Sequence, residues 1–414
     1  MTCGAPLGAL AQSEEEASKP RQSSAGEEAI QELKRAQTNE EFNLHYGHVG
    51  FRAEAGLAGY YTDNVLLSEA NRQNDFVVVP EVILGAWVPV SELNTLKLSV
   101  GVGYEWFTKN NNLNPDAPLI SPDSELVFNM FVKDFHIKLY DNFSYQQTLV
   151  INDQPVGQQR AFNFTNVTQF NRLNNFVGPT VEWDLNKVVL TAGYCHEDFI
   201  SYTEQFNYLT RATEWITNAM SYLLGEQRQI GLESLAGYTS YAEQTVLNNN
   251  WRWRIGPFGE MKVPDGILVR IGGGYDMARY GSLAVPGDNY DTGYAYAKAS
   301  QELRLFTHTL EGGRQTVLGD NANNLRIDYA RYSISSDLIK DISLEGHALA
   351  NFCREFGGSY EEHFKQYVAG LQVGYQFHKH WRAELGYEYY WNDSDLEGRT
   401  FNRNLVSLGV IFRF

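Results

Sequence analysis

Charged side chains recur at alternate positions in several segments of this 414-residue chain. One residue separates the members of each of these pairs: Arg52 and Glu54, Arg252 and Arg254, and Arg382 and Glu384. In an extended strand, residues i and i+2 project from the same face, so each pair would stand on one wall. Such a wall can form ion pairs with itself or bind polar groups of a solute. The spacing therefore indicates non-covalent chemistry.

Motifs for covalent chemistry are absent from the sequence. The chain has no G-x-S-x-G, no H-E-x-x-H, no phosphate-binding loop and no dinucleotide fingerprint. Its nine His are scattered, and at His378 and His380, which flank a predicted short turn, we favour a solvated turn over a metal site. We therefore expect no enzyme, no metal and no cofactor.

The segments that carry these charges alternate apolar and polar residues. In the last nine residues, one face holds the apolar set Val406, Leu408, Val410, Phe412 and Phe414. The same alternation covers 96–106, 342–352, 367–377 and 381–391, which is typical of strands with one apolar face. Strands of about 11 to 15 residues suit a tilted crossing of a membrane. A terminal strand that ends on Phe412 and Phe414 is similar to the assembly signal of bacterial outer-membrane proteins.

The composition fits this interpretation. Aromatic residues make up 14% of the chain and Gly accounts for 36 residues, and the aromatic rings concentrate at the ends of the apolar faces, as interfacial girdles require. No apolar run of about 18 residues predicts a transmembrane helix. With 33 basic and 50 acidic residues the net charge is −17, which argues against nucleic acid as a partner.

Links between the predicted strands alternate in length. Eight are short: 90–95, 133–134, 184–187, 224–227, 263–267, 304–308, 338–341 and 377–380. Nine are mostly longer: 62–73, 108–121, 151–168, 202–208, 243–249, 281–291, 319–323, 355–363 and 392–400. We therefore expect an all-β fold, a transmembrane antiparallel up-and-down barrel of about 18 strands, with 16 to 20 consistent and both termini in the periplasm.

If the apolar face meets lipid, the opposite face lines the lumen. The substrate-path candidates on that face are Arg52, Glu54, Arg252, Arg254, Arg270, Arg326, Asp328, Arg382, Glu384, Glu388 and Tyr390. These charges either pair across neighbouring strands as a solvated wall, or select the solutes that pass, as charged rings do in pores.

The N-terminal region differs from the rest. Residues 1–11 end in Ala9-Leu10-Ala11, which resembles a signal-peptide cleavage site, and we expect the remnant of a signal that starts upstream; a disordered terminus is the alternative. Residues 12–44 form an acidic periplasmic tail with a short helix over 27–37. The barrel covers 45–414. A disulfide between Cys195 and Cys353 is not indicated.

Four segments carry a resemblance to a known family: Tyr61–Val65, Asp75-Phe76, Trp87–Val90 and Arg403–Val410. With these, residues 45–414 resemble the β-barrel porin 2 family of bacterial outer-membrane proteins, which is often associated with exopolysaccharide export. The resemblance implies a barrel in the outer membrane that lets a secreted polysaccharide or small polar solutes cross. Expected partners are outer-membrane lipid, the barrel-assembly machinery and periplasmic polysaccharide export proteins.

Three functions remain open from the sequence. The first is a passive outer-membrane channel for polysaccharide export. The second is a general or solute-selective diffusion porin, for which the link 151–168 would be the candidate constriction. The third is a structural or enzymatic barrel with a closed lumen.

Overall fold

The computed structural model describes residues 42, 44–147, 150–151, 160–161, 170–225, 227–280, 285, 287, 289–339, 341–358 and 361–414. The expected signal remnant, nearly all of the acidic tail and most of the link 151–168 lie outside these residues. No helix among the described residues is long and apolar enough to cross a membrane.

Long strands form where the sequence alternates apolar and polar residues. The strands that build the wall have these bounds: β2 (Val49–Thr62), β3 (Asp75–Pro89), β4 (Thr95–Gly103), β7 (Glu125–Val132), β8 (Phe135–Gln146), β11 (Arg172–Asp184), β12 (Val188–Ser201), β13 (Arg211–Gly225), β14 (Arg228–Tyr241), β15 (Asn250–Lys262), β16 (Ile267–Tyr280), β17 (Tyr290–Glu302), β18 (Thr307–Leu318), β19 (Asn324–Ile339), β20 (Ile342–Phe356), β21 (Glu362–His378), β22 (Trp381–Ser394) and β23 (Phe401–Arg413).

Short elements lie at the ends of these strands. The short strands are β1 (Leu44–Tyr46), β5 (Trp106–Phe107), β6 (Leu119–Ile120), β9 (Val150–Ile151) and β10 (Arg160–Ala161). The 3-10 helices are η1 (Asn111–Leu113), η2 (Glu204–Leu209) and η3 (Pro264–Gly266).

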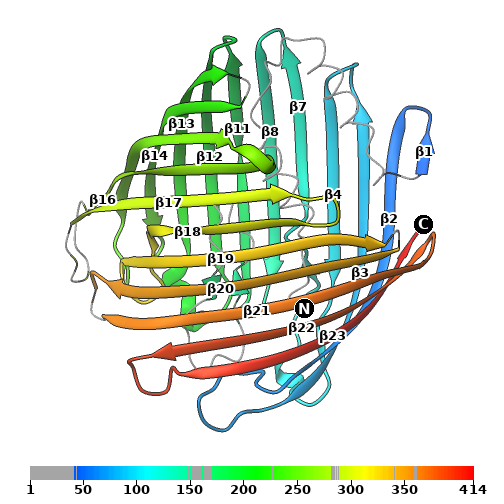
Figure 1. Ribbon diagram of the computed structural model, residues 1–414. Coiled ribbons are helices and arrows are strands. Elements are labelled where there is room, and N and C mark those ends of the chain that lie inside the picture. The colour runs from blue at the N-terminus through cyan, green and yellow to red at the C-terminus, as the bar shows by residue number, and fades with distance from the viewer. Residues whose placement is uncertain are drawn as a thin grey trace.

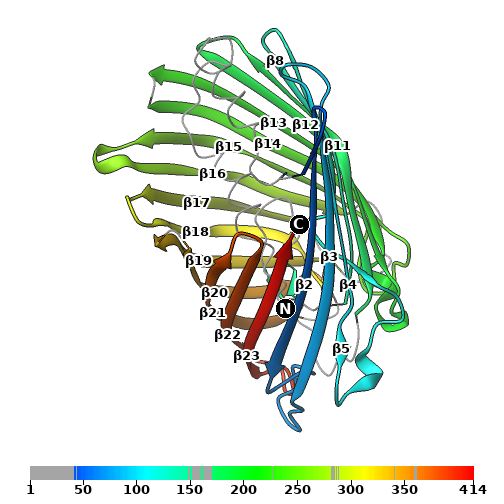
Figure 2. The same cartoon turned by 90° about the vertical axis from the view of Figure 1, so that its right-hand side faces the viewer.

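Each wall strand pairs antiparallel with its neighbours, and the last strand pairs with the first. Glu54 of β2 is in register with Arg413 of β23, and Thr62 with Leu405. The described residues therefore form a closed antiparallel barrel of 18 wall strands, as the sequence predicts. Figure 1 shows β16 to β23 crossing in front of β2, β4, β7 and β8, and Figure 2 shows β23 beside β2.

The predicted links fall where the strands end. Pro89 ends β3 and Thr95 begins β4, and likewise Asp184 ends β11 and Val188 begins β12. All eight predicted short links join strands at one end of the barrel, which we call the short-turn rim. The longer links gather at the other end, which we call the long-loop rim.

The outer face of the wall is apolar between two zones of aromatic rings. Leu57, Leu310, Leu385 and Leu408 are all more than half exposed there. Near the short-turn rim, the ring of Trp381 lies 4.7 Å from that of Phe412, which in turn contacts Phe414. Toward the long-loop rim, Tyr367 stacks on Trp391 at 5.2 Å. On β22 the two zones are ten residues apart, from Trp381 to Trp391, which in a tilted strand spans an apolar belt of about 25 Å.

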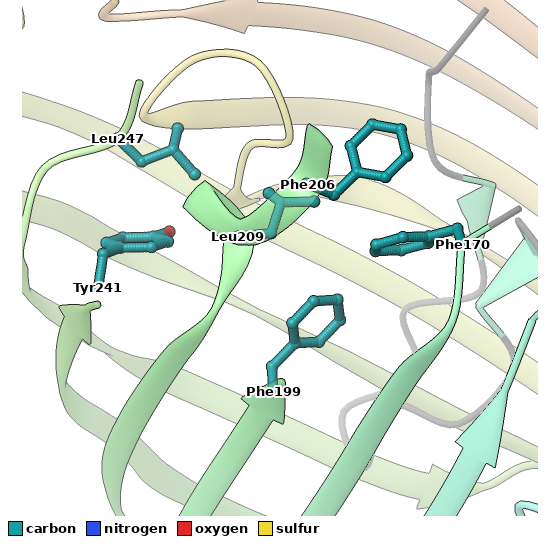
Figure 3. Close-up of a cluster of buried hydrophobic side chains, with 6 residues drawn as sticks. All are labelled: Phe170, Phe199, Phe206, Leu209, Tyr241 and Leu247. Atoms are coloured by element: carbon teal, nitrogen blue, oxygen red, sulfur yellow. The ribbon is translucent and has the colours of Figure 1, made fainter. Parts of the chain in front are cut away.

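The pattern of faces changes at the long-loop rim, where the inner face becomes apolar. Phe170, Phe199, Phe206, Leu209, Tyr241 and Leu247 form a buried cluster there, and Figure 3 shows their side chains converging beside η2. A second cluster packs Val317, Leu325 and Ile327 against Cys353 and Phe364. Loops therefore pack onto the inner face at this rim, and some charged residues of the wall strands lie on the outer face there.

This inversion corrects the sequence prediction for Arg326 and Asp328, which do not face the lumen. Asp328 is directly opposite Phe352, whose side chain is 48% exposed on the outer face. Their neighbours Leu325 and Ile327 are buried on the inner face. The prediction assumed that the apolar face meets lipid along the whole strand, but above the belt the outer face meets a polar medium.

Candidate functional site

The inner wall holds the other predicted substrate-path residues. Residues that are opposite each other in register share one face of the wall. This pairing places the following residues on the lumenal face: Arg52, Glu54, Arg252, Arg254, Arg270, Arg382, Glu384, Glu388 and Tyr390. The structure brings them together in separate groups around the barrel rather than in one site. Their position is thereby known, while their part in a substrate path remains a prediction.

The first group lies at the closure between β2 and β23. The Glu54 carboxylate accepts a hydrogen bond from Arg52 Nη2 at 2.8 Å and another from Arg413 Nε. Glu54 is only 4% exposed, so a buried carboxylate is matched by two guanidinium groups. Loss of either arginine would leave the charge poorly compensated. This group joins the first and last wall strands.

The second group lies on β22 and its neighbours. Arg382 Nε donates to Glu384 Oε1 at 2.8 Å, and Arg382 Nη2 donates to Ser343 Oγ at the same distance. Nearer the long-loop rim, Arg403 Nη2 donates to Glu388 at 2.9 Å. Tyr390 stacks on Phe401 with 5.6 Å between ring centroids and is buried. Tyr390 thus lies on the inner face of the wall, but its ring is buried in a cluster with Leu67 and Phe401.

The third group is the most densely connected part of the inner wall. Arg270 Nη2 donates to Glu233 at 3.1 Å, and its Nη1 lies 3.6 Å from Glu260. The hydroxyls of Tyr294 and Tyr296 also donate to Glu233, at 3.2 and 3.0 Å. We call Glu233, Glu260, Arg270, Tyr294 and Tyr296 the lumenal cluster.

A glycine makes room for the lumenal cluster. A Cβ at Gly272 would lie 2.5 Å from the Tyr296 ring and hydroxyl, so the Tyr296 ring can lie across β16 only because residue 272 is Gly. The sequence alone did not predict this contact. Glu233, Tyr294 and Tyr296 were not among the predicted residues either, although Tyr294, Tyr296 and Lys298 alternate on one face.

Arg254 and Arg252 extend this wall toward the long-loop rim. Arg254 Nη2 donates at 2.9 Å to Asp276, which is fully buried, and its guanidinium lies 4.9 Å from the centre of the Tyr294 ring. Arg252 donates to the main-chain carbonyls of Thr316 at 3.1 Å and Val317 at 3.3 Å. In the described register of β17 with β18, pairing ends at Arg314, so this end of β18 relies on Arg252.

Loops at the long-loop rim are tied to one another. Asn248 of the β14–β15 loop donates its main-chain N–H to Asn323 Oδ1 at 2.7 Å, and its Nδ2 donates to the Val285 carbonyl at 3.0 Å. In the β12–β13 loop, burial raises the pKa of Tyr208, with Asp320 and Glu355 adding to the shift. Tyr208 therefore stays neutral beneath the loops.

The described residues contain no group of three or more His, Cys, Asp and Glu side chains placed to hold a metal ion. The rings of His378 and His380 are 5.7 Å apart at the short-turn rim. Cys195 and Cys353 are not joined in a disulfide.

This chain is similar to known proteins in fold but not in sequence. No family model and no curated protein matches the chain. Among solved structures, a BenF-like porin from Pseudomonas fluorescens is similar with a TM-score of 0.50 and 9% identity, over 88% of this chain and 99% of the porin. OpdK with vanillate and OccK2 (OpdF) with glucuronate, both from Pseudomonas aeruginosa, have TM-scores of 0.48 and 0.49, identities of 11% and 10%, and cover 88% of this chain and 99% and 98% of theirs.

The likeness to the BenF-like porin is one of fold. The shared architecture is the outer-membrane barrel, and an apolar outer belt between aromatic zones fits that membrane. The chain thus has a closed antiparallel barrel fold of 18 wall strands among its described residues, the fold of the BenF-like porin.

Proposed function

We propose that this barrel is a passive diffusion channel for small polar solutes, with the short-turn rim and both termini in the periplasm. The observation that carries the proposal is the inner wall. A closed barrel of 18 strands is wide enough for an aqueous passage, and its inner face is lined by charged and tyrosine side chains. The similar fold of the BenF-like porin supports this function.

Charge pairing on the inner wall points to solutes without a strong net charge. Arg270, Arg254 and Arg382 each contact a carboxylate on their own or a neighbouring strand. A ring of unpaired like charges would favour one sign of ion, whereas paired charges present alternating polarity at short range. We infer weak charge selectivity and polar solutes, such as neutral polyols or zwitterions.

The loops argue for small solutes over an exported polysaccharide. Four separate loops contact one another at the long-loop rim through the bonds of Asn248 and of Asn323, which also donates to the Gly357 carbonyl. Apolar clusters hold further loop segments against the wall beneath them. A polymer would have to displace these contacts along its whole length, so the diffusion-porin alternative is better supported than export.

Three measurements test the proposal. The purified barrel in a planar bilayer is expected to show stepwise conductance, and a bilayer that never conducts at any voltage contradicts every channel function. Swelling of barrel-containing liposomes should then fall as the solute grows from mono- to oligosaccharide. In a deletion strain we expect slower uptake of small solutes with normal surface polysaccharide; lost polysaccharide with normal uptake would restore the export function.

Three further predictions are proposals of the same kind. Residues 1–11 are proposed as a signal remnant, and 12–44 as a periplasmic tail. The rings of Phe412 and Phe414, in edge contact on the last strand, are proposed to bind the barrel-assembly machinery. Phe414→Ala should lower the amount of assembled barrel in cells while refolding in detergent stays normal.

A further inference from the structure

A basic cluster lies on the outer face of β18 to β21, at the long-loop rim. Its members are Arg314, Arg326, Arg354 and Lys365. The register makes the cluster contiguous: Arg314 is opposite Asp328, Arg326 is opposite Arg354, and Lys365 is opposite Phe352, the residue next but one to Arg354. Four cationic side chains from four consecutive strands therefore share one outward patch.

The carboxylates nearby do not fully match these cations. Asp328 alone serves both Arg314, whose Nη2 is 3.1 Å away, and Arg326, whose Nε is 3.9 Å away. Arg354 pairs with Glu361, and Lys365 Nζ lies 3.7 Å from Asp393. Like charges directly opposite on a sheet are unfavourable, and Arg326 faces Arg354 in this way. An anion between the two guanidinium groups would relieve that repulsion.

The position of the basic cluster relative to the aromatic zone of the outer face indicates the kind of anion. Phe352, between Arg354 and the belt, packs edge-on against Tyr367 at 6.1 Å, and Tyr367 stacks on Trp391. Such aromatic zones lie at the level of lipid headgroups. Below them the outer face continues with Ala330 opposite Ala350, where acyl chains can lie close to the wall. The cluster therefore stands where lipid phosphates are found.

We propose that Arg314, Arg326, Arg354 and Lys365 bind the phosphate groups of a phosphorylated glycolipid in the outer leaflet. Planar guanidinium groups match phosphate oxygens in bidentate geometry. Another charged group on the outer face at this rim differs in sign: His196 contacts both Glu214 and Asp198. The proposed site therefore lies on the β18 to β21 side of the barrel. The inference uses the orientation proposed above and is independent of what crosses the lumen.

Native mass spectrometry of the full-length barrel in detergent, titrated with bisphosphorylated lipid A, tests this site. The double variant Arg326→Gln/Arg354→Gln should lose affinity by about tenfold or more. A matched control, Lys187→Gln/Lys379→Gln, removes the same charge from two exposed turns at the short-turn rim and should bind as the wild type does. Asp328→Asn, which removes the shared carboxylate, should bind more tightly, a gain that misfolding cannot produce.

Two further arms identify the source of the phosphate. Fully dephosphorylated lipid A should bind as weakly to the wild type as bisphosphorylated lipid binds to the double variant. Inorganic phosphate at the same concentration should not displace the lipid. Each of three results would overturn the proposal. The double variant could bind as tightly as the wild type, the wild type could bind dephosphorylated and bisphosphorylated lipid A equally, or inorganic phosphate could displace the lipid. Channel conductance should be the same in all these variants.

Discussion

The guanidinium of Arg252 donates to the main-chain carbonyl of Thr316 at 3.1 Å, although β15 and β18 are separated by two strands in the sheet. Arg252 is 4% exposed and also donates to Asn324 Oδ1 at 3.1 Å. β18 has left its ladder with β17 at this point. The Arg252 side chain thus holds the end of β18, which does not pair with β17 there.

Arg252→Met should therefore destabilise the long-loop rim. The substitution keeps apolar bulk but leaves buried carbonyls without a donor, at a cost of about 1–3 kcal/mol for each. We expect a lower unfolding temperature and faster proteolysis between β18 and β19. The matched control is Arg72→Met, which removes one exposed hydrogen bond to Asn402 and should change neither. Equal behaviour of the two variants would show that Arg252 is dispensable for the rim.

Asp75 is expected to hold the loop that follows β5. Its Oδ1 accepts from the Thr108 and Lys109 main-chain N–H groups at 3.1 and 3.0 Å, and its Oδ2 accepts from that of Asn110 at 2.9 Å. Asp75→Ala should raise amide hydrogen exchange at Lys109 and Asn110 by about 100-fold, since hydrogen bonds to a charged acceptor each contribute about 1.5–3 kcal/mol. Asp75→Asn keeps one acceptor oxygen and should lie between; unchanged exchange in both variants would contradict the role.

The sequence was sufficient to predict the architecture because alternation and link length are local properties. The segment 381–391 alternates strictly, and β22 indeed begins at Trp381. At each short link, such as 133–134, the alternation of apolar and polar residues is interrupted. Pairing of the last wall strand with the first followed from the predicted barrel, but the register that sets Glu54 opposite Arg413 did not.

Site prediction failed where the medium around the wall changes. Arg326 and Asp328 were assigned to the lumen because their neighbours Leu325 and Ile327 are apolar, but those neighbours pack beneath loops. Sequence alternation does not reveal where the lipid belt ends along a strand. The prediction included only part of the lumenal cluster for another reason. Glu233, Tyr294 and Tyr296 come together across β14 to β17 only through the register of the sheet, which the sequence does not give.

Ion selectivity should respond to the lumenal cluster. Glu233→Gln/Glu260→Gln removes both carboxylates that Arg270 contacts, so the wall there gains positive charge. Under a KCl gradient, the reversal potential should shift toward anion selectivity, with the cation-to-anion permeability ratio falling about twofold or more. Asp328→Asn also removes a carboxylate, but on the outer face, and should leave the potential unchanged. A shift with Asp328→Asn equal to that of the double variant would contradict this assignment of faces.

The facing of β19 can be tested chemically. In a background with Cys3, Cys195 and Cys353 replaced by Ala, Asp328→Cys should react with a maleimide carried on a lipid headgroup, because its side chain lies outward beside Phe352. Arg331→Cys, on the inner face opposite Leu349, should react at least about tenfold more slowly with that lipid, since the wall separates them. A soluble maleimide should label Arg331→Cys through the lumen. Preferential lipid labelling of Arg331→Cys would instead place the odd-numbered residues of β19 outside, and would restore Arg326 and Asp328 to the channel wall.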